Sequence, residues 1–154
     1  MLTRSKKSKK SAVSGRFAIV ASKYNGRYVN SMLKAARAEL EAAGAEEVKV
    51  VRVPGAYEIP VVVGALARQE KPWDAIICLG VIMRGATTHA QHIGDAVSLA
   101  LAEVQVRHGV PVVHEVLLFE NEEQAKVRCL SKDFNRGNEA AQTAIEMAGV
   151  MRAL

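Results

Sequence analysis

The sequence predicts an α/β fold, a three-layer α-β-α sandwich built on a four-stranded parallel sheet. Three observations lead there. Short β-branched apolar segments alternate with amphipathic ones along the chain, in the order expected of repeated strand–helix units. The third apolar segment, residues 74–82, is uninterrupted, as in a parallel strand covered on both faces. The length of 154 residues suits one domain with an ordinary core.

Each element follows from its local pattern. The expected strands are residues 17–22, 48–53, 74–82 and 110–119, each rich in Val and Ile. A first helix is expected from apolar residues at helical spacing, Val29, Met32, Ala36 and Leu40, with Gly44 as a C-terminal cap. A second helix opens at Glu58-Ile59-Pro60 and ends by Pro72, and a third carries Ile93, Val97, Leu101 and Val104. Residues 121–130 and 137–151 are expected to form two closing helices.

The charge divides the chain into two parts. Six of the 21 Lys and Arg residues lie within residues 1–16, where there is no acid, so the remaining 15 cations face 16 acids and the rest carries −1. We therefore expect residues 1–14 to be a disordered basic tail and residues 15–154 to be a single domain. Such a tail is more often a solvated terminus than a nucleic-acid ligand, so nucleic acid is not expected as a partner. No apolar run is long enough for a membrane span, and the tail lacks the apolar segment of a secretory signal.

The two cysteines, Cys78 and Cys129, are too few for a disulfide scaffold and lack metal-ligand spacing. Free thiols favour a cytoplasmic location. The last helix has two apolar stripes, Ala141-Ala144-Ile145-Ala148 and Ala140-Met147-Met151, of which a surface helix needs one. The second stripe indicates either contact with a partner subunit or simply an Ala-rich helix, and the sequence leaves both open.

Polar residues follow the expected strands. In an open parallel sheet, ligands bind outside the carboxyl ends of the strands. Tyr24 and Asn25 follow the first strand, and Tyr57 and Glu58 follow the second. The third strand is followed by residues 84–89, RGATTH, and His114 and Glu115 are placed toward the end of the fourth. We therefore expect four loops to meet in one site.

The loop over residues 85–88 precedes a helix, so its backbone N–H groups are expected to hold an oxyanion such as phosphate. The alternative is a threonine that merely caps the helix, with Arg84 in solvent. His89 falls in the first helical turn, where the helix dipole favours a neutral ring that can exchange protons. His89 and His92 have the spacing of a metal pair but no third ligand, so no metal site is expected.

A second basic group lies in residues 127–137. Arg128, Lys132 and Arg136 fall together near a helix end, where guanidinium groups suit phosphate, although basic helix ends are common. No nucleotide-binding glycine motif is present in the sequence.

Two motifs resemble the lumazine synthase family, which acts in riboflavin biosynthesis. They are VPGAYEIP (53–60) and DAIICLGVIMRGATTH (74–89), and the likeness extends from Phe17 to about Met151. The resemblance implies flavodoxin-like winding of the sheet and a transferase without metal or organic cofactor. The implied reaction condenses 5-amino-6-(D-ribitylamino)uracil with 3,4-dihydroxy-2-butanone 4-phosphate to 6,7-dimethyl-8-ribityllumazine, phosphate and water.

The resemblance also implies roles for individual residues. His89 would transfer protons, and Ala86, Thr87 and Arg128 would bind the butanone phosphate. The ribitylaminouracil would contact Tyr24, Ala56, Tyr57, Glu58, Val81, Ile82, Met83 and His114. Additional candidates beside them are Asn25, Gly85, Thr88, Lys132 and Arg136.

Family members form pentamers, some packed further into decamers or sixty-subunit shells, with His114 and Arg128 contributed by the adjacent subunit. The sequence does not choose among these assemblies. It departs from the family at His114, where phenylalanine is usual, at Ala90, where an aromatic is usual, and in residues 22–25 and 117–121. These departures keep open a non-catalytic flavin or ribityl binder or a shell of the same fold. A titratable His114 predicts weaker substrate binding at mildly acidic pH.

Overall fold

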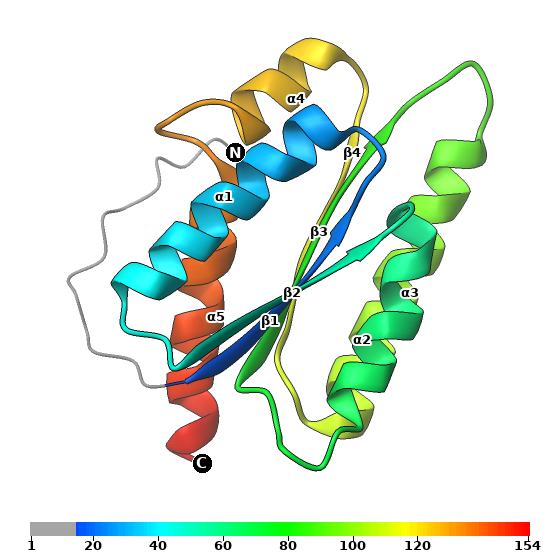
Figure 1. Ribbon diagram of the computed structural model, residues 1–154. Coiled ribbons are helices and arrows are strands. Elements are labelled where there is room, and N and C mark those ends of the chain that lie inside the picture. The colour runs from blue at the N-terminus through cyan, green and yellow to red at the C-terminus, as the bar shows by residue number, and fades with distance from the viewer. Residues whose placement is uncertain (1–14) are drawn as a thin grey trace.

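The structure, a computed structural model, describes residues 15–154, and the expected disordered tail at residues 1–14 lies outside the described residues. Ten elements follow one another along the chain (Figure 1). They are β1 (Arg16–Ser22), α1 (Gly26–Ala42), β2 (Glu47–Val53), the 3-10 turn η1 (Ala56–Glu58), α2 (Ile59–Ala67), β3 (Ala75–Met83), α3 (His89–His108), β4 (Val112–Phe119), α4 (Glu122–Cys129) and α5 (Arg136–Arg152).

The four strands form one parallel sheet in the order β2-β1-β3-β4. This order confirms the predicted fold class, because it is the winding of flavodoxin-like sheets. The central strand β3 is buried along nearly its whole length, which explains its uninterrupted apolar sequence. Strand β4 is an edge strand, and His114 pairs there in register with Cys78 of β3.

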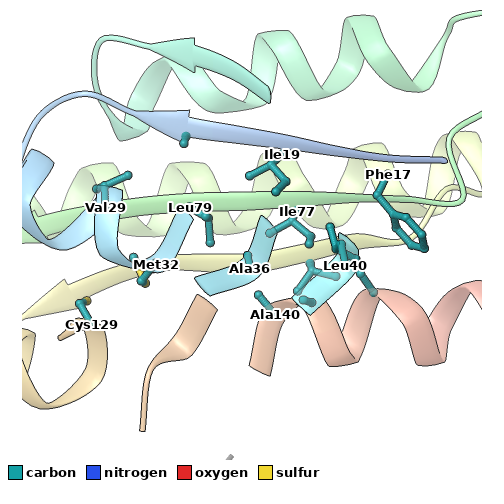
Figure 2. Close-up of a cluster of buried hydrophobic side chains, with 14 of the residues drawn as sticks. Phe17, Ile19, Val29, Met32, Ala36, Leu40, Ile77, Leu79, Cys129 and Ala140 are labelled. Carbon is teal, nitrogen blue, oxygen red and sulfur yellow. The ribbon is translucent and has the colours of Figure 1, made fainter. Parts of the chain in front are cut away.

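Helices cover both faces of the sheet. Figure 1 shows α1 and α5 on one side and α2 and α3 on the other. Side chains alternate along β1, so that Phe17 and Ile19 enter the first layer while Val20 enters the second. Figure 2 shows the first layer, where Met32 and Leu40 of α1 pack against the sheet. The described residues thus form two apolar layers, one on each face of the sheet.

The contact between α1 and α5 depends on a glycine and a cap. A Cβ on Gly137 would lie only 2.0 Å from the carbonyl oxygen of Met32, so no other residue fits there without movement of the helices. Asn135 caps α5, because its Oδ1 accepts from the Gly137 N–H at 2.8 Å. Its Nδ2 donates to the Cys129 carbonyl at 2.8 Å and joins the end of α4 to the start of α5.

The prediction of two apolar stripes on α5 is wrong in one respect. Ala140, assigned to the second stripe with Met147 and Met151, is fully buried with Ala141 and Ala144 in the first layer. The helix turns about 100° per residue, so neighbouring Ala140 and Ala141 can share one core face. Of the other two residues in the second stripe, Met147 is half-buried and Met151 is exposed.

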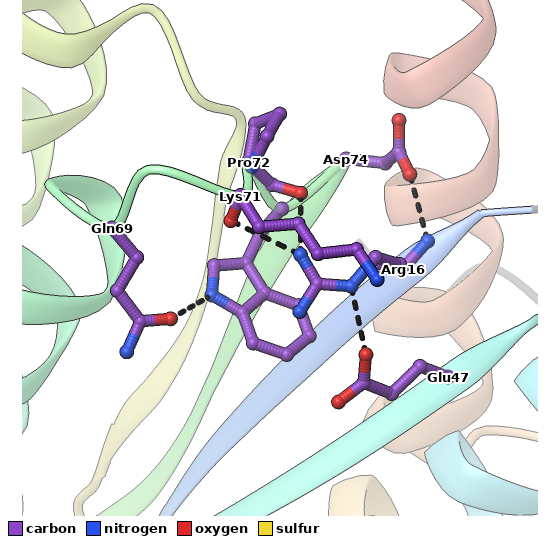
Figure 3. A network of polar contacts seen from close by, with 7 residues as sticks. Arg16, Glu47, Gln69, Lys71, Pro72 and Asp74 are labelled. Atoms are coloured by element: carbon purple, nitrogen blue, oxygen red, sulfur yellow. Dashed lines mark hydrogen bonds and ion pairs between the residues drawn. The ribbon is translucent and has the colours of Figure 1, made fainter.

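The amino end of the sheet is held by Arg16, the first residue of β1 (Figure 3). Its Nε donates to Glu47 Oε2 at 2.7 Å, and its guanidinium lies 4.0 Å from the centre of the Trp73 ring. The same guanidinium donates to the backbone carbonyls of Lys71 and Pro72 at 3.0 and 2.9 Å. One side chain thereby joins β1, β2 and the segment that leads into β3.

Within residues 15–154, no helix combines the length and apolar character needed to cross a membrane.

Candidate active site

A cavity of about 800 Å³ opens at the carboxyl ends of β1 and β3, where an open parallel sheet is expected to bind ligands. Its walls come from the loop after β1, from η1, from the end of β3, and from the loop and first two turns of α3. The lining residues are Tyr24, Asn25, Gly55, Ala56, Tyr57, Glu58, Val81, Ile82, Met83, Gly85, Thr87, His89, Ala90, His92, Ile93 and Ala96.

The cavity gathers most of the residues proposed from the sequence. Three of the four predicted loops meet there. Ala86 and Thr88 belong to the same loop as Gly85 and Thr87 but do not line the cavity. His114, Arg128, Lys132 and Arg136 lie elsewhere in the chain. The sequence predicted no substrate contact for Gly55, Ala90, His92, Ile93 and Ala96. The signal for the last two is their spacing from His89, which places them on the same face of α3.

The loop after β1 is tied to both neighbouring strands. Asn25, at φ 56° and ψ 41°, adopts the left-handed conformation at the start of α1. Its Nδ2 donates to the Val81 carbonyl of β3 at 2.8 Å. The Tyr24 N–H donates to the Pro54 carbonyl at 3.0 Å. Asn25, proposed as an additional ligand, therefore already has a role in holding the cavity wall.

Tyr24 lies over the loop that follows β2. A Cβ on Gly55 would come within 2.9 Å of the Tyr24 ring, so glycine permits this approach. The Gly55 N–H donates to Glu58 Oε2 at 3.1 Å, which fixes the carboxylate of Glu58 at the cavity. Tyr24 and Tyr57 remain 65% and 67% exposed, so the chain itself does not cover these two rings.

The end of β3 offers backbone groups to the cavity. The pairing of β1 with β3 ends at Leu79, whereas β3 continues to Met83. Backbone groups two residues apart on a strand point the same way, so Met83 faces the β1 side like Val81. Within the described residues, Met83 has no strand neighbour on that side. Its N–H and C=O are therefore available to a ligand.

The loop over residues 85–88 leads into α3 as predicted, and all four residues are exposed. Thr88 occupies the N-cap position but makes no side-chain cap hydrogen bond. Thr87 Oγ1 accepts from the His89 N–H at 3.4 Å. Arg84 pairs with Glu120 at 3.3 Å rather than extending freely into solvent. The helix start therefore keeps exposed N–H groups that suit an oxyanion.

His89 is the first residue of α3, and its exposed side chain lines the cavity. His92, one turn later, lies beside it, with Nε2 3.3 Å from Thr88 Oγ1. In the described part of the chain, no three His, Cys, Asp or Glu side chains are grouped to hold a metal ion.

Arg128 lines a second cavity, of about 530 Å³, between the end of β4 and α4. Its other walls are Leu117, Leu118, Phe119, Glu123, Gln124 and Val127. Between residues 15 and 154, the half-buried Arg128 has no ion pair. Arg136, by contrast, pairs with Glu115 at 3.1 Å and with Glu139 at 3.0 Å. Of the three proposed basic ligands, Arg136 is thus already neutralised, and Lys132 is exposed in the loop after α4.

His114 and Glu115 are not near the end of their strand as predicted, because they are the third and fourth residues of β4. Successive residues of a strand face opposite sides. His114 accordingly contacts Ser98 of α3, while Glu115 contacts Arg136 of α5. The two side chains therefore face opposite sides of the sheet, and neither lines the cavity of the single chain.

Glu115 is 6% exposed, and burial raises its pKa to about 7 although the Arg136 guanidinium opposes that shift. A neighbouring carboxylate, Glu139, adds to the rise. The raised pKa brings the charge change of Glu115 closer to neutral pH than that of an ordinary glutamate.

Known proteins are similar to this chain in sequence. The family model of 6,7-dimethyl-8-ribityllumazine synthase matches residues 14–152. A protein of that name from Desulfotalea psychrophila is 43% identical over 141 residues, which cover 90% of each chain. Another, from Xanthomonas oryzae pv. oryzae, is 40% identical over 141 residues, or 90% of this chain and 91% of that one. A de novo designed Rossmann fold protein aligns with 72% of this chain and 90% of its own at 18% identity and a TM-score of 0.38, which carries no inference.

The family match spans nearly all described residues, and both relatives are covered almost completely. This chain therefore belongs to the 6,7-dimethyl-8-ribityllumazine synthase family.

Proposed function

We propose that this chain catalyses the condensation of 5-amino-6-(D-ribitylamino)uracil with 3,4-dihydroxy-2-butanone 4-phosphate, a step of riboflavin biosynthesis. The products are 6,7-dimethyl-8-ribityllumazine, phosphate and water. One observation carries the proposal: in a chain of this family, residues from both sequence motifs line a single cavity with His89 at its helix start.

The pyrimidine ring would bind in the part of the cavity formed by Tyr24, Tyr57 and the end of β3. The two exposed tyrosine rings offer flat apolar surface to a heterocycle. The N–H and C=O of Met83, which have no strand neighbour on the β1 side within the described residues, match the alternating donors and acceptors of a uracil edge. Glu58, held by the Gly55 N–H, would accept hydrogen bonds from ribityl hydroxyls.

The phosphate of the second substrate would bind at the start of α3. The exposed N–H groups over residues 85–88 and the Thr87 hydroxyl suit an oxyanion. Arg128 supplies a guanidinium from the second cavity, which a single chain does not join to the first. A complete site therefore requires a second copy.

The proposed reaction requires few catalytic groups from the protein. The pyrimidine substrate brings its own amine, which attacks the ketone of the second substrate, so no lysine is required to form the imine. Holding two reactants side by side supplies most of the acceleration. His89 would move protons as water and phosphate depart, and the donors around the phosphate would stabilise its leaving charge.

An oligomer of identical copies would join the two half-sites. Apolar side chains lie exposed on two helices of one face, Val61 of α2 and Leu99 and Val106 of α3, at 71%, 74% and 83%. Val150 and Met151 are exposed on α5 of the other face. Two different surfaces that contact each other in neighbouring copies generate a closed ring when the rotation between the copies closes. We infer a pentamer, with decamers and sixty-subunit shells as further packings of it.

Turnover is tested by mixing purified protein with both substrates and following lumazine fluorescence above the slow uncatalysed reaction. The expected result is saturable, enzyme-dependent product formation. Saturable binding of riboflavin or the lumazine with no turnover would instead identify a non-catalytic binder, the alternative that the His114 departure keeps open.

Assembly is tested by sedimentation velocity, because a monomer, a pentamer and a sixty-subunit shell differ greatly in mass. A protein that stays monomeric while turning over would overturn the shared site. We also infer a cytoplasmic location, since both cysteines are free and buried thiols.

A further inference from the structure

The contact between His114 and Ser98 concerns a position that the proposed reaction leaves unexplained. His114, on edge strand β4, places Nε2 2.8 Å from Ser98 Oγ of α3. The Ser98 Oγ is also 2.8 Å from the Gly94 carbonyl oxygen. On the other side of the ring, the Val116 N–H donates to Nδ1 at 3.1 Å. Both ring nitrogens therefore have partners within the chain.

The positions of the hydrogens in these contacts determine which tautomer the His114 ring adopts. Ser98 has a single hydroxyl hydrogen, which the Gly94 carbonyl can only accept. Ser98 Oγ is then the acceptor of the His114 contact, so Nε2 carries a hydrogen. The Val116 N–H is a donor, so Nδ1 must carry none. Two independent contacts thus specify the same neutral tautomer.

Protonation of the ring would place an N–H at Nδ1 against the Val116 N–H. Partial desolvation also lowers the pKa of His114, although a hydrogen bond with its own backbone opposes that shift. Three titratable groups neighbour the contact between His114 and Ser98. Asp95 lies within one helical turn of Ser98, Glu115 follows His114 on β4, and Cys78 is the register partner of His114 on β3. The Asp95 carboxylate accepts from Gln91 at 2.9 Å, and burial raises the pKa of the Cys78 thiol and keeps it neutral. Glu115 faces the opposite side of the sheet, toward Arg136.

We propose that Ser98 is a positioning residue which, with the Val116 N–H, holds His114 as a neutral ring that offers a ligand its π-face but no hydrogen bond and no charge. The inference rests on the proposed function and on the contact that the family resemblance implies, in which His114 of one copy meets the heterocycle bound by its neighbour. It replaces the expectation of a histidine that weakens binding at mildly acidic pH. His114 can take the place of an aromatic hydrocarbon ring because both of its ring nitrogens are hydrogen-bonded within the chain, to Ser98 and to the Val116 N–H.

The main experiment measures the dissociation constant of 6,7-dimethyl-8-ribityllumazine by fluorescence at pH 6.0 and pH 8.0. The proteins are the assembled wild type, Ser98→Ala, Ser98→Thr and His114→Phe. Ratios to His114→Phe at each pH cancel any titration of the lumazine itself. Ser98 lies exposed on α3, where alanine favours the helix, so Ser98→Ala is expected to fold.

The wild type and Ser98→Thr should show a normalised pH effect below twofold. Ser98→Ala should bind about fourfold more weakly at pH 6.0 than at pH 8.0, because a released histidine is mostly protonated there. His114→Phe should bind within about threefold of the wild type. A flat profile in Ser98→Ala, or a greater loss in His114→Phe, would overturn the proposal.

The tautomer is tested independently of turnover by ¹⁵N nuclear magnetic resonance of histidine-labelled protein, with His114→Phe assigning the signal. A protonated Nε2 and bare Nδ1 at pH 7 are expected. The opposite tautomer, or a charged ring, would overturn the proposal that Ser98 and the Val116 N–H hold His114 neutral. This would be so even if turnover is observed. If the wild type binds no lumazine yet shows the expected tautomer, the proposed function fails and the ring geometry stands.

Discussion

The two ends of the sheet use polar residues in opposite ways. At the amino end, Arg16 donates to Glu47 and to two backbone carbonyls and lies over the Trp73 ring (Figure 3). At the carboxyl end, Tyr24, Tyr57 and His89 stay exposed around a cavity. The first end satisfies its polar groups within the chain and contributes stability, whereas the second keeps them exposed around the cavity.

We therefore expect residues at the amino end of the sheet to contribute to stability and residues at the carboxyl end to contribute to the proposed reaction. A substitution at the amino end should change the free energy of unfolding and leave turnover unchanged. A substitution at the carboxyl end should do the reverse. Four variants test this division, from the largest expected effect to the smallest.

Arg16→Ala should lower the free energy of unfolding by about 3 kcal/mol, because it removes charged hydrogen bonds and a cation–π contact from a largely buried side chain. Denaturant titration at fixed protein concentration measures the loss. The matched control is Arg37→Ala, whose exposed pair with Glu41 should cost about 0.5 kcal/mol or less. Equal losses of stability in both variants, or a lower kcat at 20 °C in Arg16→Ala, would contradict the prediction that the amino end of the sheet contributes to stability and not to turnover.

Glu115→Gln should remove a pH dependence of stability worth about 2 kcal/mol. The folded pKa of Glu115, about 7, lies above its ordinary value of 4.5, so the folded state holds a proton that the unfolded chain releases between these values. The wild type should therefore be most stable relative to the variant in acid and lose that advantage as pH rises through 7. Denaturant midpoints at pH 5, 6, 7 and 8 measure the difference, and parallel curves would contradict the prediction.

Arg128→Ala should raise the KM for the butanone phosphate about tenfold, or about 1.4 kcal/mol, with little change in thermal stability. The guanidinium has no ion pair within residues 15–154 to lose on substitution. Lys126→Ala, on the same helix, is the control, because it breaks only an exposed pair with Glu123. A comparable rise in KM in the control would show that α4 acts through general charge.

His89→Ala should lower kcat about fivefold, or about 1 kcal/mol, while KM for either substrate changes less than twofold. The effect is small because orientation, not proton transfer, supplies most of the acceleration. The variant isolates proton transfer from binding at the carboxyl end. A loss above a hundredfold would show that His89 does more than assist, and an unchanged kcat would remove it from the site.

Much of the carboxyl end could be predicted from the sequence, because strand ends and helix starts are local features. The apolar run that ends in Arg84 placed the loop over residues 85–88 and His89 correctly at the start of α3. The Arg16 network was not predicted. It joins residues 31 and more than 50 positions apart, and no local pattern records such a pairing.

The sequence by itself determined the order of strands and helices, the two faces of the sheet and the family motifs, because hydrophobic period and turn residues act over a few positions. Only the tertiary structure decided that Ala140 is core, that Arg136 pairs with Glu115 while Arg128 has no ion pair within residues 15–154, and that His114 contacts Ser98. The physical reason is that burial and pairing depend on which distant segments meet, and those contacts exist only once the layers have packed.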